Sequence, residues 1–499
     1  MTLRGLLGHW PLGIVLLLVF SFSWPVFDQY GLRPDGSIRL FGAHYTDSIN
    51  NIALIQSLKR SVPPENPNLS GTYLTNYHYF INLILAWISK YLNLDAFFVY
   101  FRLAPAILIS GLTLLTYFTI FQLTTSRFRA TLGTLLGMLS SNLYYTSSYL
   151  YPRLFSTPSV AWIDEFSTRL VNFQYLSSLV IILVLILLFS RGVKPWLVGL
   201  ASGFLVGFKI YGWIAFTLAC LTVRKFRLTG VISLLVGILV GFLALGSSLN
   251  GPPFVFNPFW FIKTMYESPD RLNYPTWELA RQTLLSTRSY VGIIKLYLIG
   301  LAVYLFINFG PRLIAFFGRS INPTESLLRR LSLISIFIPL LFIQSGAVWN
   351  SIQFSYYSVF FLSILTAVRI KNPLALASVW IVLLPGVVYT SSLYAHPPYT
   401  AQIDKKIVEA AQFLSTQPAG SVYLDSKYAG NATVSAISGH SAYLGDRSVL
   451  SSYGIDFSTR KNQPVFPEVS YLFLDSQSSP APGFEIIYSN FQVKLFRVK

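Results

Sequence analysis

The sequence predicts a mainly α-helical, polytopic membrane protein of about eleven membrane segments, ending in a small α/β domain outside the membrane. Composition is the first observation: of the 499 residues 53% are hydrophobic and 11% are charged, whereas soluble domains carry roughly 25% charged residues. The second is the recurrence of apolar stretches of about 20 residues, the length that crosses a bilayer. The third is a net charge of +18 that is spread unevenly over the loops. So apolar a chain excludes one long soluble protein and a disordered protein.

The transmembrane domain is predicted to cover residues 1–392. Its first apolar stretch, 7–26, lacks a small-residue cleavage site and is longer than the apolar core of a cleaved signal peptide, so we expect a signal anchor. The predicted spans are 7–26, 101–123, 130–149, 171–190, 228–248, 290–310, 331–347, 354–369 and 373–392.

The loops between these spans predict the orientation of the chain. One set of loops carries 14 basic residues against a single acid, Glu325, whereas the opposite loops and the C-terminal tail have a net charge near zero. Because basic residues concentrate on the cytoplasmic side, we expect a multi-pass protein of the plasma or inner membrane with its N-terminus inside and its C-terminus outside. The topology accounts for most of the excess charge, so nucleic-acid binding is unsupported.

Two segments do not fit simple spans. Residues 77–92 are short, with polar residues near one helical face and large apolar residues on the other, which predicts a helix lying in the interface plane, within the first outer loop 27–99. Residues 195–222 have basic flanks at both ends. At 1.5 Å per residue they reach about 21 Å each way if folded back, which predicts a hairpin of two short helices that turns near Lys209.

The tail, residues 393–499, is predicted to be an extracytoplasmic α/β domain. Strands are expected at 422–425, 441–450 and 470–475, with a closing pair in 484–498 and a helix around 432–437.

The spans contain almost no carboxylates, which disfavours an ion-coupled carrier. Cys220 is the only cysteine and the five histidines are scattered, so neither a disulfide framework nor a cysteine-based zinc site is available. Polar residues gather instead in the outward loops, which suits a reaction at the outer surface on a lipid-borne substrate.

The first outer loop is the most informative stretch. Asp47 opens an amphipathic run, 48–58, and the turn PPENP (63–67) then leads to Gly71 and to the aromatic YHYF, which contains His78. An Asp at this place also caps a helix readily, and the two roles are compatible. His78 is either an ordinary interfacial residue or a ligand of substrate or metal.

This order of an acid, a proline-rich turn, a glycine and an aromatic interfacial helix resembles the GT-C glycosyltransferase superfamily, in particular its protein O-mannosyltransferase and aminoarabinose transferase type. The stretch FVYFRLAPAILISG and the hairpin KPWLVGLASGFLVGFKIYGW are similar to the superfamily's pattern as well. The likeness covers roughly residues 1–250. It implies a GT-C-like fold and an inverting transferase that takes a sugar from a polyprenyl-phosphate donor on the outer face.

The resemblance also implies roles for single residues. Asp47 matches the catalytic base, or a ligand of a base-assisting metal, because a carboxylate must take the proton of the attacking hydroxyl. Arg102 and Lys209 would hold the charged phosphate of the donor. Arg102 could equally snorkel at the end of a span, whereas a lysine within an apolar hairpin is unfavourable unless it is paired or faces water.

The second outer loop adds Arg153, Asp164, Glu165 and Arg169, which could bind substrate or metal. The two acids could instead complement the dipole of the helix that follows. The superfamily commonly has two adjacent acids where this sequence has Thr46-Asp47. The cofactor is therefore left open between a divalent metal ion and none. The charged residues of the third loop (Lys263, Glu267, Asp270 and Arg271) are expected on a solvated amphipathic helix.

The sequence is compatible with three functional hypotheses. The first is a membrane glycosyltransferase whose partners are a polyprenyl-phosphate-sugar donor, membrane lipid, and an acceptor lipid, glycan or protein. The second is an envelope polysaccharide polymerase or ligase, although such enzymes concentrate arginines in a late outer loop, whereas the distinctive acid here lies early. The third is a non-enzymatic membrane scaffold, which would be indifferent to the loss of the Asp47 carboxylate.

Overall fold

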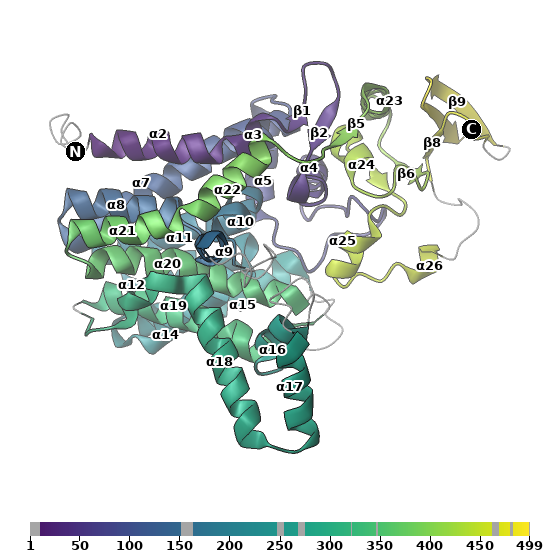
Figure 1. Cartoon of the computed structure of the whole chain (residues 1–499). Helices are drawn as coiled ribbons and strands as arrows, with labels where there is room; N and C mark the ends of the chain where they lie inside the picture. The colour runs from purple at the N-terminus through teal and green to yellow at the C-terminus, as the bar shows by residue number, and fades with distance from the viewer. Residues whose placement is uncertain are drawn as a thin grey trace.

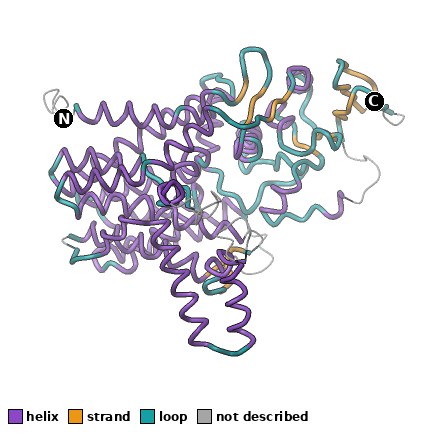
Figure 2. The backbone as a smooth tube through the Cα atoms, in the orientation of Figure 1, coloured by secondary structure: helices purple, strands orange, loops and turns teal. Residues whose placement is uncertain are grey.

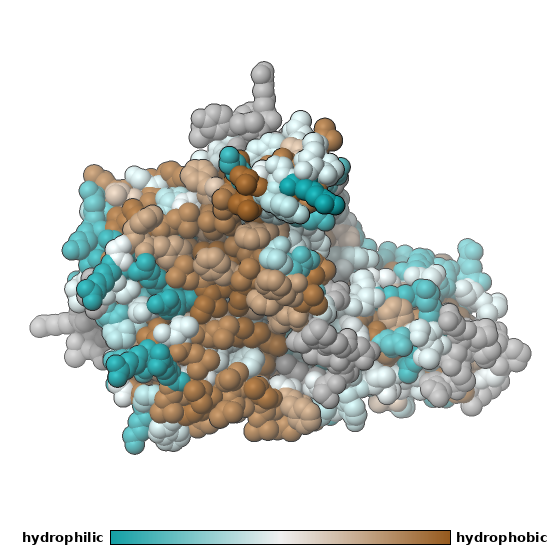
Figure 3. All heavy atoms as spheres, turned by 90° about the horizontal axis from the view of Figure 1, so that it is seen from below, coloured by the Kyte–Doolittle hydropathy of each residue, from teal (hydrophilic) through white to brown (hydrophobic). Residues whose placement is uncertain are grey.

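A bundle of helices stands beside a smaller domain that contains most of the strands (Figures 1 and 2). The computed structural model describes residues 10–150, 163–246, 254–267, 275–320, 322–345, 348–461, 469–479 and 483–498, without the side chains of 148–150 and 245. Figure 3 shows an apolar surface over the bundle, with hydrophilic side chains at one end and on the smaller domain. An apolar belt between two hydrophilic ends is the surface expected of a membrane protein.

Six helical segments of the described chain are long and apolar enough to cross a membrane, and each overlaps a predicted span. They are Ala96–Thr124 (with α6, Ala96–Phe98, and α7, Ala104–Thr124), Phe173–Ser190 (α11), Arg224–Ala244 (with α15, Arg227–Leu245), Tyr290–Phe316 (with α18, Tyr290–Phe309), Val348–Arg369 (with α20, Gln353–Arg369) and Pro373–Ala395 (with α21, Pro373–Leu383, and α22, Pro385–Ala395). The other five predicted segments correspond to shorter, interrupted or more polar helices, so the count of about eleven spans stays a prediction.

One predicted span, 130–149, is wrong. Helix α8 (Arg127–Met138) stops at Met138, and α9 (Tyr144–Leu150) begins after an irregular stretch. The guanidinium group of Arg169 donates to the carbonyl oxygen of Gly137 (2.9 Å) and that of Arg312 donates to the carbonyl oxygen of Ser141 (2.7 Å). Buried backbone carbonyls need such partners where a helix ends inside apolar surroundings. Two distant arginines supply them, which no local hydrophobic pattern can reveal.

The hairpin predicted for 195–222 is confirmed. Its legs are α12 (Pro195–Gly203) with α13 (Leu205–Phe208), and α14 (Ile210–Thr222). Both legs pack along α15: the hydroxyl of Thr229 donates to the carbonyl oxygen of Pro195 at the start of the first leg (2.9 Å), and Gly230 lies against Leu221 near the end of the second. The chain therefore turns back between them, and Lys209, whose backbone is extended (φ −161°), lies at the turn.

Helix α5 (Phe80–Tyr91) is the helix predicted for 77–92, and its 12 residues are too few to cross a membrane. Its apolar face points outward, since Trp87 is 50% exposed and Ile84 is 40% exposed. Its polar residues Asn82 and Ser89 are buried against the protein. The location of this helix at a membrane surface stays a prediction.

The C-terminal domain is built on a five-stranded sheet of order β7-β6-β8-β10-β9. Strand β6 is parallel to β7 and β8, and the other neighbours are antiparallel. The bounds are β6 (Ser421–Leu424), β7 (Ser441–Ala442), β8 (Tyr471–Asp475), β9 (Phe484–Ser489) and β10 (Val493–Val498), with helices α23 (Lys405–Ser415), α24 (Thr433–Ser438), α25 (Arg447–Ser452) and α26 (Ser458–Lys461).

Most elements predicted in this domain are confirmed, but a strand through 441–450 is wrong. Only β7 is extended, and helix α25 follows it. The carboxylate of Asp446 accepts hydrogen bonds from the backbone N–H groups of Ser448 (2.9 Å) and Val449 (3.2 Å). This N-cap starts a helix and outweighs the strand propensity of the apolar residues after it.

The C-terminal domain is joined closely to the first outer loop. Strand β5 (Ala401–Ile403) pairs with β2 (Ile38–Leu40), which also pairs with β1 (Gly31–Leu32). Helix α24 packs on α4 (Asp47–Leu58), and the N–H of Ala442 donates to the carbonyl oxygen of Pro67 (2.9 Å). Segments more than 300 residues apart in the sequence therefore meet at one end of the helix bundle.

Candidate functional site

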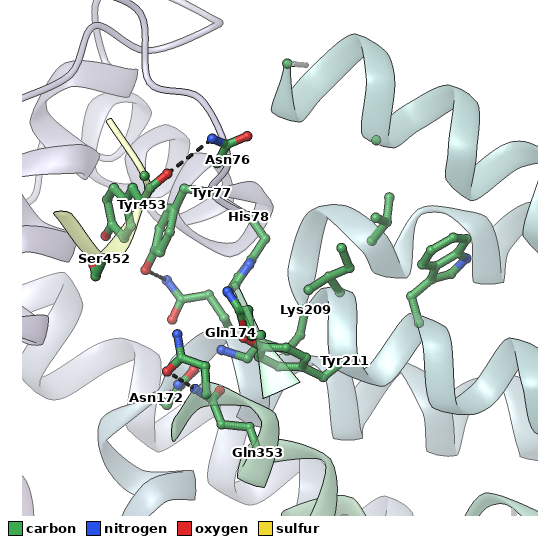
Figure 4. Close-up of a pocket in the computed structure, with 18 of the residues that line it drawn as sticks. Asn76, Tyr77, His78, Asn172, Gln174, Lys209, Tyr211, Gln353, Ser452 and Tyr453 are labelled. Carbon is green, nitrogen blue, oxygen red and sulfur yellow. Dashed lines mark hydrogen bonds between the residues drawn. The ribbon is translucent and has the colours of Figure 1, made fainter. Parts of the chain in front are cut away.

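A cavity of about 640 Å³ opens between the helix bundle and the C-terminal domain (Figure 4). Its walls come from α4, the segment before α5, α11, the hairpin turn, α15, the β3–β4 ribbon (Phe254–Phe256 and Phe342–Gln344) and α25. Asp47, His78 and Lys209, which the sequence singled out separately, all line it.

Asp47 is the first residue of α4, and its side chain is open to the cavity. The capping position is occupied by Thr46, whose side chain makes no capping bond, so Asp47 is placed where the helix dipole favours a negative charge. The protein around the cavity displaces bulk water and thereby raises the pKa of the Asp47 carboxyl above its ordinary value of 3.8. The nearby positive charge of Lys209 partly opposes this rise.

Lys209 brings a cation to another wall of the cavity. Its side chain extends from the hairpin turn, and the residue is only 4% exposed. No hydrogen bond or ion pair of its ammonium group is found among the described residues, and the nitrogen lies 5.2 Å from the centre of the Tyr211 ring. Asp47 is near enough to interact with this charge but forms no direct ion pair with it. A buried cation that no anion contacts directly is unfavourable, so its presence here favours an anionic ligand.

His78 lies between Tyr77 and Lys209 in the wall of the cavity (Figure 4). Its ring stacks on that of Tyr77 at 4.9 Å. Burial, and secondly the charge of Lys209, lower the pKa of the imidazole well below its ordinary value of 6.5. A neutral His78 leaves one cationic and one anionic side chain among the described residues that line the cavity.

A network of uncharged amides forms the inner wall. The amide nitrogen of Gln174 lies within hydrogen-bonding distance of Asn51 Oδ1 (2.7 Å), Asn82 Oδ1 (2.9 Å) and the Tyr77 hydroxyl oxygen (2.9 Å), and its two hydrogens are shared among these acceptors. The Asn51 amide nitrogen donates to the carbonyl oxygen of Asp47 (2.8 Å). These bonds tie the first turn of α4 to α5 and α11 and hold it rigidly in the wall.

The C-terminal domain supplies the outer wall through Val449, Ser452, Tyr453 and Gly454. The ring of Tyr453 packs on that of Tyr77 with centroids 4.7 Å apart. No motif marks these residues in the sequence, and only the pairing of distant segments brings them to the cavity.

Arg102 does not line the cavity. It lies in a π-helical turn, Val99–Leu103, at the start of α7. Its guanidinium group donates to the backbone carbonyl oxygens of Phe27 (2.6 Å), Asp28 (2.9 Å) and Tyr30 (3.3 Å). It therefore fixes the chain between α2 (Pro11–Ser23) and β1 and is not brought together with Asp47 and Lys209.

The two acids of the second loop are also away from the cavity. The carboxylate of Asp164 caps α10 (Glu165–Val171) at the N–H of Ser167 (3.3 Å). Glu165 forms an ion pair with Arg169 (3.2 Å), and both side chains are 1% exposed. This matches the alternative in which the acids complement a helix terminus.

Arg153, Asp270 and Arg271 lie outside the described residues. Lys263 and Glu267 form an exposed ion pair (3.4 Å) on α16 (Trp260–Glu267), as a solvated helical face would.

The donor set does not fit a metal ion held by the protein alone. Asp47 and His78 are the only carboxylate and imidazole side chains among the described residues of the cavity wall. Across the described chain, no three His, Cys, Asp or Glu side chains are grouped closely enough to bind one ion.

Comparison with known proteins finds no matching family model and no matching curated protein. Solved structures of an oligosaccharyltransferase from Archaeoglobus fulgidus are similar in the course of the chain. A complex with Zn and sulfate is 13% identical with a TM-score of 0.47, and the alignment covers 86% of this chain but 62% of the other. A complex of the oligosaccharyltransferase AglB from Archaeoglobus fulgidus with an inhibitory peptide and a dolichol-phosphate is 13% identical with a TM-score of 0.45, and the alignment covers 94% of this chain and 69% of the other. A likeness at this level concerns the arrangement of the chain and no single residue.

Proposed function

We propose that this chain is a membrane glycosyltransferase that moves a sugar from a polyprenyl-phosphate donor to an acceptor at the outer face of the membrane. One observation carries the proposal: a cavity between an apolar helix bundle and a polar domain holds an unpaired lysine on one wall and a carboxylate on another. A lipid phosphate requires the first group and an attacking hydroxyl requires the second.

Lys209 is the proposed phosphate-binding residue. It sits where the hairpin turns, beside the apolar residues Val206 and Phe242 of the cavity wall. A polyprenyl chain could follow this apolar side while its phosphate meets the ammonium group. As the sugar leaves, negative charge grows on the phosphate, and a cation in surroundings of low dielectric constant stabilises it more strongly than water does.

Asp47 is the proposed general base. The nucleophilic hydroxyl of the acceptor attacks the anomeric carbon, the bond from that carbon to the phosphate oxygen breaks, and the Asp47 carboxylate takes the hydroxyl proton. Retaining glycoside hydrolases, which also act at an anomeric carbon, use a carboxylate nucleophile beside a second carboxyl group. The described wall of the cavity contains a single carboxylate, which supports direct displacement with inversion.

The amides and hydroxyls around these two residues suit a sugar. Asn172, Gln344 and Gln353 line the cavity with both donors and acceptors. No arginine lines the described part of the wall, in contrast to the pattern expected of a polysaccharide polymerase or ligase. A scaffold would have no use for an unpaired buried cation.

The test is a comparison of Asp47→Asn and Lys209→Met with the unchanged protein. Asp47→Asn keeps size and hydrogen bonding but cannot accept a proton, so turnover should fall by about 10²–10⁴-fold with little change in donor binding. Lys209→Met should weaken the binding of undecaprenyl phosphate to the purified protein in lipid nanodiscs. Glycans, glycolipids and glycoproteins of cells carrying each variant would be compared by mass spectrometry.

The matched control is Asp404→Asn. Asp404 caps α23 in the C-terminal domain, and Asn caps a helix as well as Asp does, so this variant should behave as the unchanged protein. Full transfer activity in Asp47→Asn would refute the assignment of the base.

A further inference from the structure

Tyr453 immediately follows α25 in the C-terminal domain and lines the same cavity as Asp47. We propose that Tyr453 is a positioning residue for Asp47, so that the C-terminal domain completes the site. This inference rests on the proposed function in assigning the base, but its structural part can be measured without any activity.

The side chain and backbone of Tyr453 bind two segments of the first outer loop. The Tyr453 hydroxyl accepts a hydrogen bond from the amide nitrogen of Asn50 (2.9 Å), and its carbonyl oxygen accepts one from the amide nitrogen of Asn76 (3.1 Å). Figure 4 shows the bond with Asn76 and the Tyr453 ring beside that of Tyr77. Asn50 is buried and lies three residues after Asp47, in the first turn of α4.

The second polar atom of the Asn50 side chain is also held through the C-terminal domain. Its oxygen accepts a hydrogen bond from the amide nitrogen of Asn68 (2.7 Å). The oxygen of Asn68 in turn accepts one from the backbone N–H of Asp446, the residue that caps α25 (3.1 Å). The neighbouring Asn51 is bound from the opposite side by Gln174. The turn that carries Asp47 is thus fixed between the helix bundle and the C-terminal domain.

Loss of the Tyr453 hydroxyl leaves the buried amide nitrogen of Asn50 without its partner. A buried donor seeks another partner, and the first turn of α4 should shift or loosen. A small misplacement of a catalytic group can lower a rate by orders of magnitude. Tyr453→Phe should therefore reduce kcat by about tenfold. It should leave the binding of undecaprenyl phosphate unchanged, because Lys209 is positioned by the hairpin.

Tyr428→Phe is the matched control. The Tyr428 hydroxyl donates to the carbonyl oxygen of Gln492 (2.9 Å) within the same domain, away from the cavity. Both variants remove a hydrogen-bonded phenolic hydroxyl of the C-terminal domain, so an effect that comes only from a less stable domain appears in both.

Thiol alkylation measures how accessible and reactive a cysteine at position 47 is, and so reports a shift of this residue. The single native cysteine, Cys220, is fully buried, so an Asp47→Cys variant of the full chain reports the reactivity of that site against a silent background. Its alkylation rate would be compared with those after adding Tyr453→Phe or Tyr428→Phe. In the protein that retains Asp47, kcat and KM would be measured for Tyr453→Phe, for Asn50→Ala and for the double variant that carries both changes.

The expected result is a several-fold change in alkylation with Tyr453→Phe alone, a lower kcat at constant KM, and a double variant no worse than the worse single variant. Unchanged alkylation, or an equal change with Tyr428→Phe, would overturn the inference. In one further outcome, alkylation of the Asp47→Cys variant changes as expected, yet the unchanged protein transfers sugar from no polyprenyl-phosphate-sugar donor. In that case the proposed function fails, while the positioning of residue 47 by Tyr453 stands.

Discussion

At the scale of single residues, the buried cations of the helix bundle fall into two kinds. Arg169 and Arg312 are buried, and their guanidinium groups donate to backbone carbonyls where α8 ends. Arg102 binds carbonyls in the same way. Lys209 makes no such bond among the described residues and faces a cavity. A buried charge that protein groups do not satisfy lowers stability, and such groups concentrate at functional sites.

The raised pKa of Asp47 predicts a pH-dependent difference in stability. Because its pKa in the folded protein lies above 3.8, the folded chain holds the proton more tightly than the unfolded chain. The resulting stabilisation is present below the ordinary pKa and is lost as pH rises through the raised pKa. The side chain at position 47 of the Asp47→Asn variant does not titrate. As pH rises from the ordinary pKa of Asp47 to its raised pKa, the free energy of unfolding of the variant should therefore increase relative to that of the unchanged protein. At higher pH this difference should stay constant. Chemical unfolding in detergent from acid to neutral pH would measure this difference.

Asp456→Asn provides a control in which the pH dependence of the stability difference has the opposite sign. Hydrogen bonds from Ser458 lower the pKa of the exposed Asp456, so its contribution is present at neutral pH and lost as pH falls. A difference between Asp47→Asn and the unchanged protein that does not vary with pH would contradict the raised pKa.

At the scale of elements, the hairpin turn is fixed by contact with α5. A Cβ atom on Gly207 would collide with the ring of Phe80, and Phe80 also packs edge-on against Phe208 with centroids 5.8 Å apart. The absence of a side chain at Gly207 thus allows α5 to lie against the turn that carries Lys209.

Gly207→Ala should destabilise the protein by about 1–3 kcal/mol, the usual effect of overpacking, and weaken the binding of undecaprenyl phosphate because the turn moves. Gly111→Ala is the matched control: that helical glycine has open space around it, so alanine should stabilise by about 0.5–1 kcal/mol. Thermal unfolding of the two variants distinguishes them. Equal stabilities would show that the close packing at the turn is unimportant.

At the scale of the whole molecule, the proposed chemistry requires the C-terminal domain and the cavity to lie on the outer side. The charge asymmetry of the loops predicts this orientation. In the structure, the guanidinium group of Arg129 donates to the carbonyl oxygen of Val368 (3.3 Å), so the basic turns at 124–127 and 369–373 lie together at one end of the bundle. The C-terminal domain lies at the other end (Figure 1).

Cysteine labelling tests the orientation. A membrane-impermeant thiol reagent added to intact cells should label a Ser451→Cys variant, whose side chain is exposed on α25, and should not label Ser320→Cys until the membrane is opened. The buried Cys220 contributes no background. Labelling in the reverse order would place the cavity on the cytoplasmic side and remove the basis for an outer-face reaction.

Much of the local structure could be predicted from the sequence alone. Long apolar stretches and charged loops determined six membrane-length helices, the short amphipathic α5 and the hairpin that turns at Lys209. Asp47, His78 and Lys209 could also be chosen as candidates, because a charged or titratable residue among apolar and aromatic neighbours is conspicuous in one dimension. These features depend on residues close together in the chain, where periodicity and charge are informative.

Only the tertiary structure decided which of these residues meet. The bond between Asn50 and Tyr453 spans 403 positions, and the arginines that end α8 come from α10 and from the turn after α18. Arg102 and Lys209 look alike in the sequence, as cations near apolar segments, yet one binds carbonyls and the other faces the cavity. The physical reason is that hydrogen-bond satisfaction of a buried group depends on neighbours in space, which local sequence patterns do not specify.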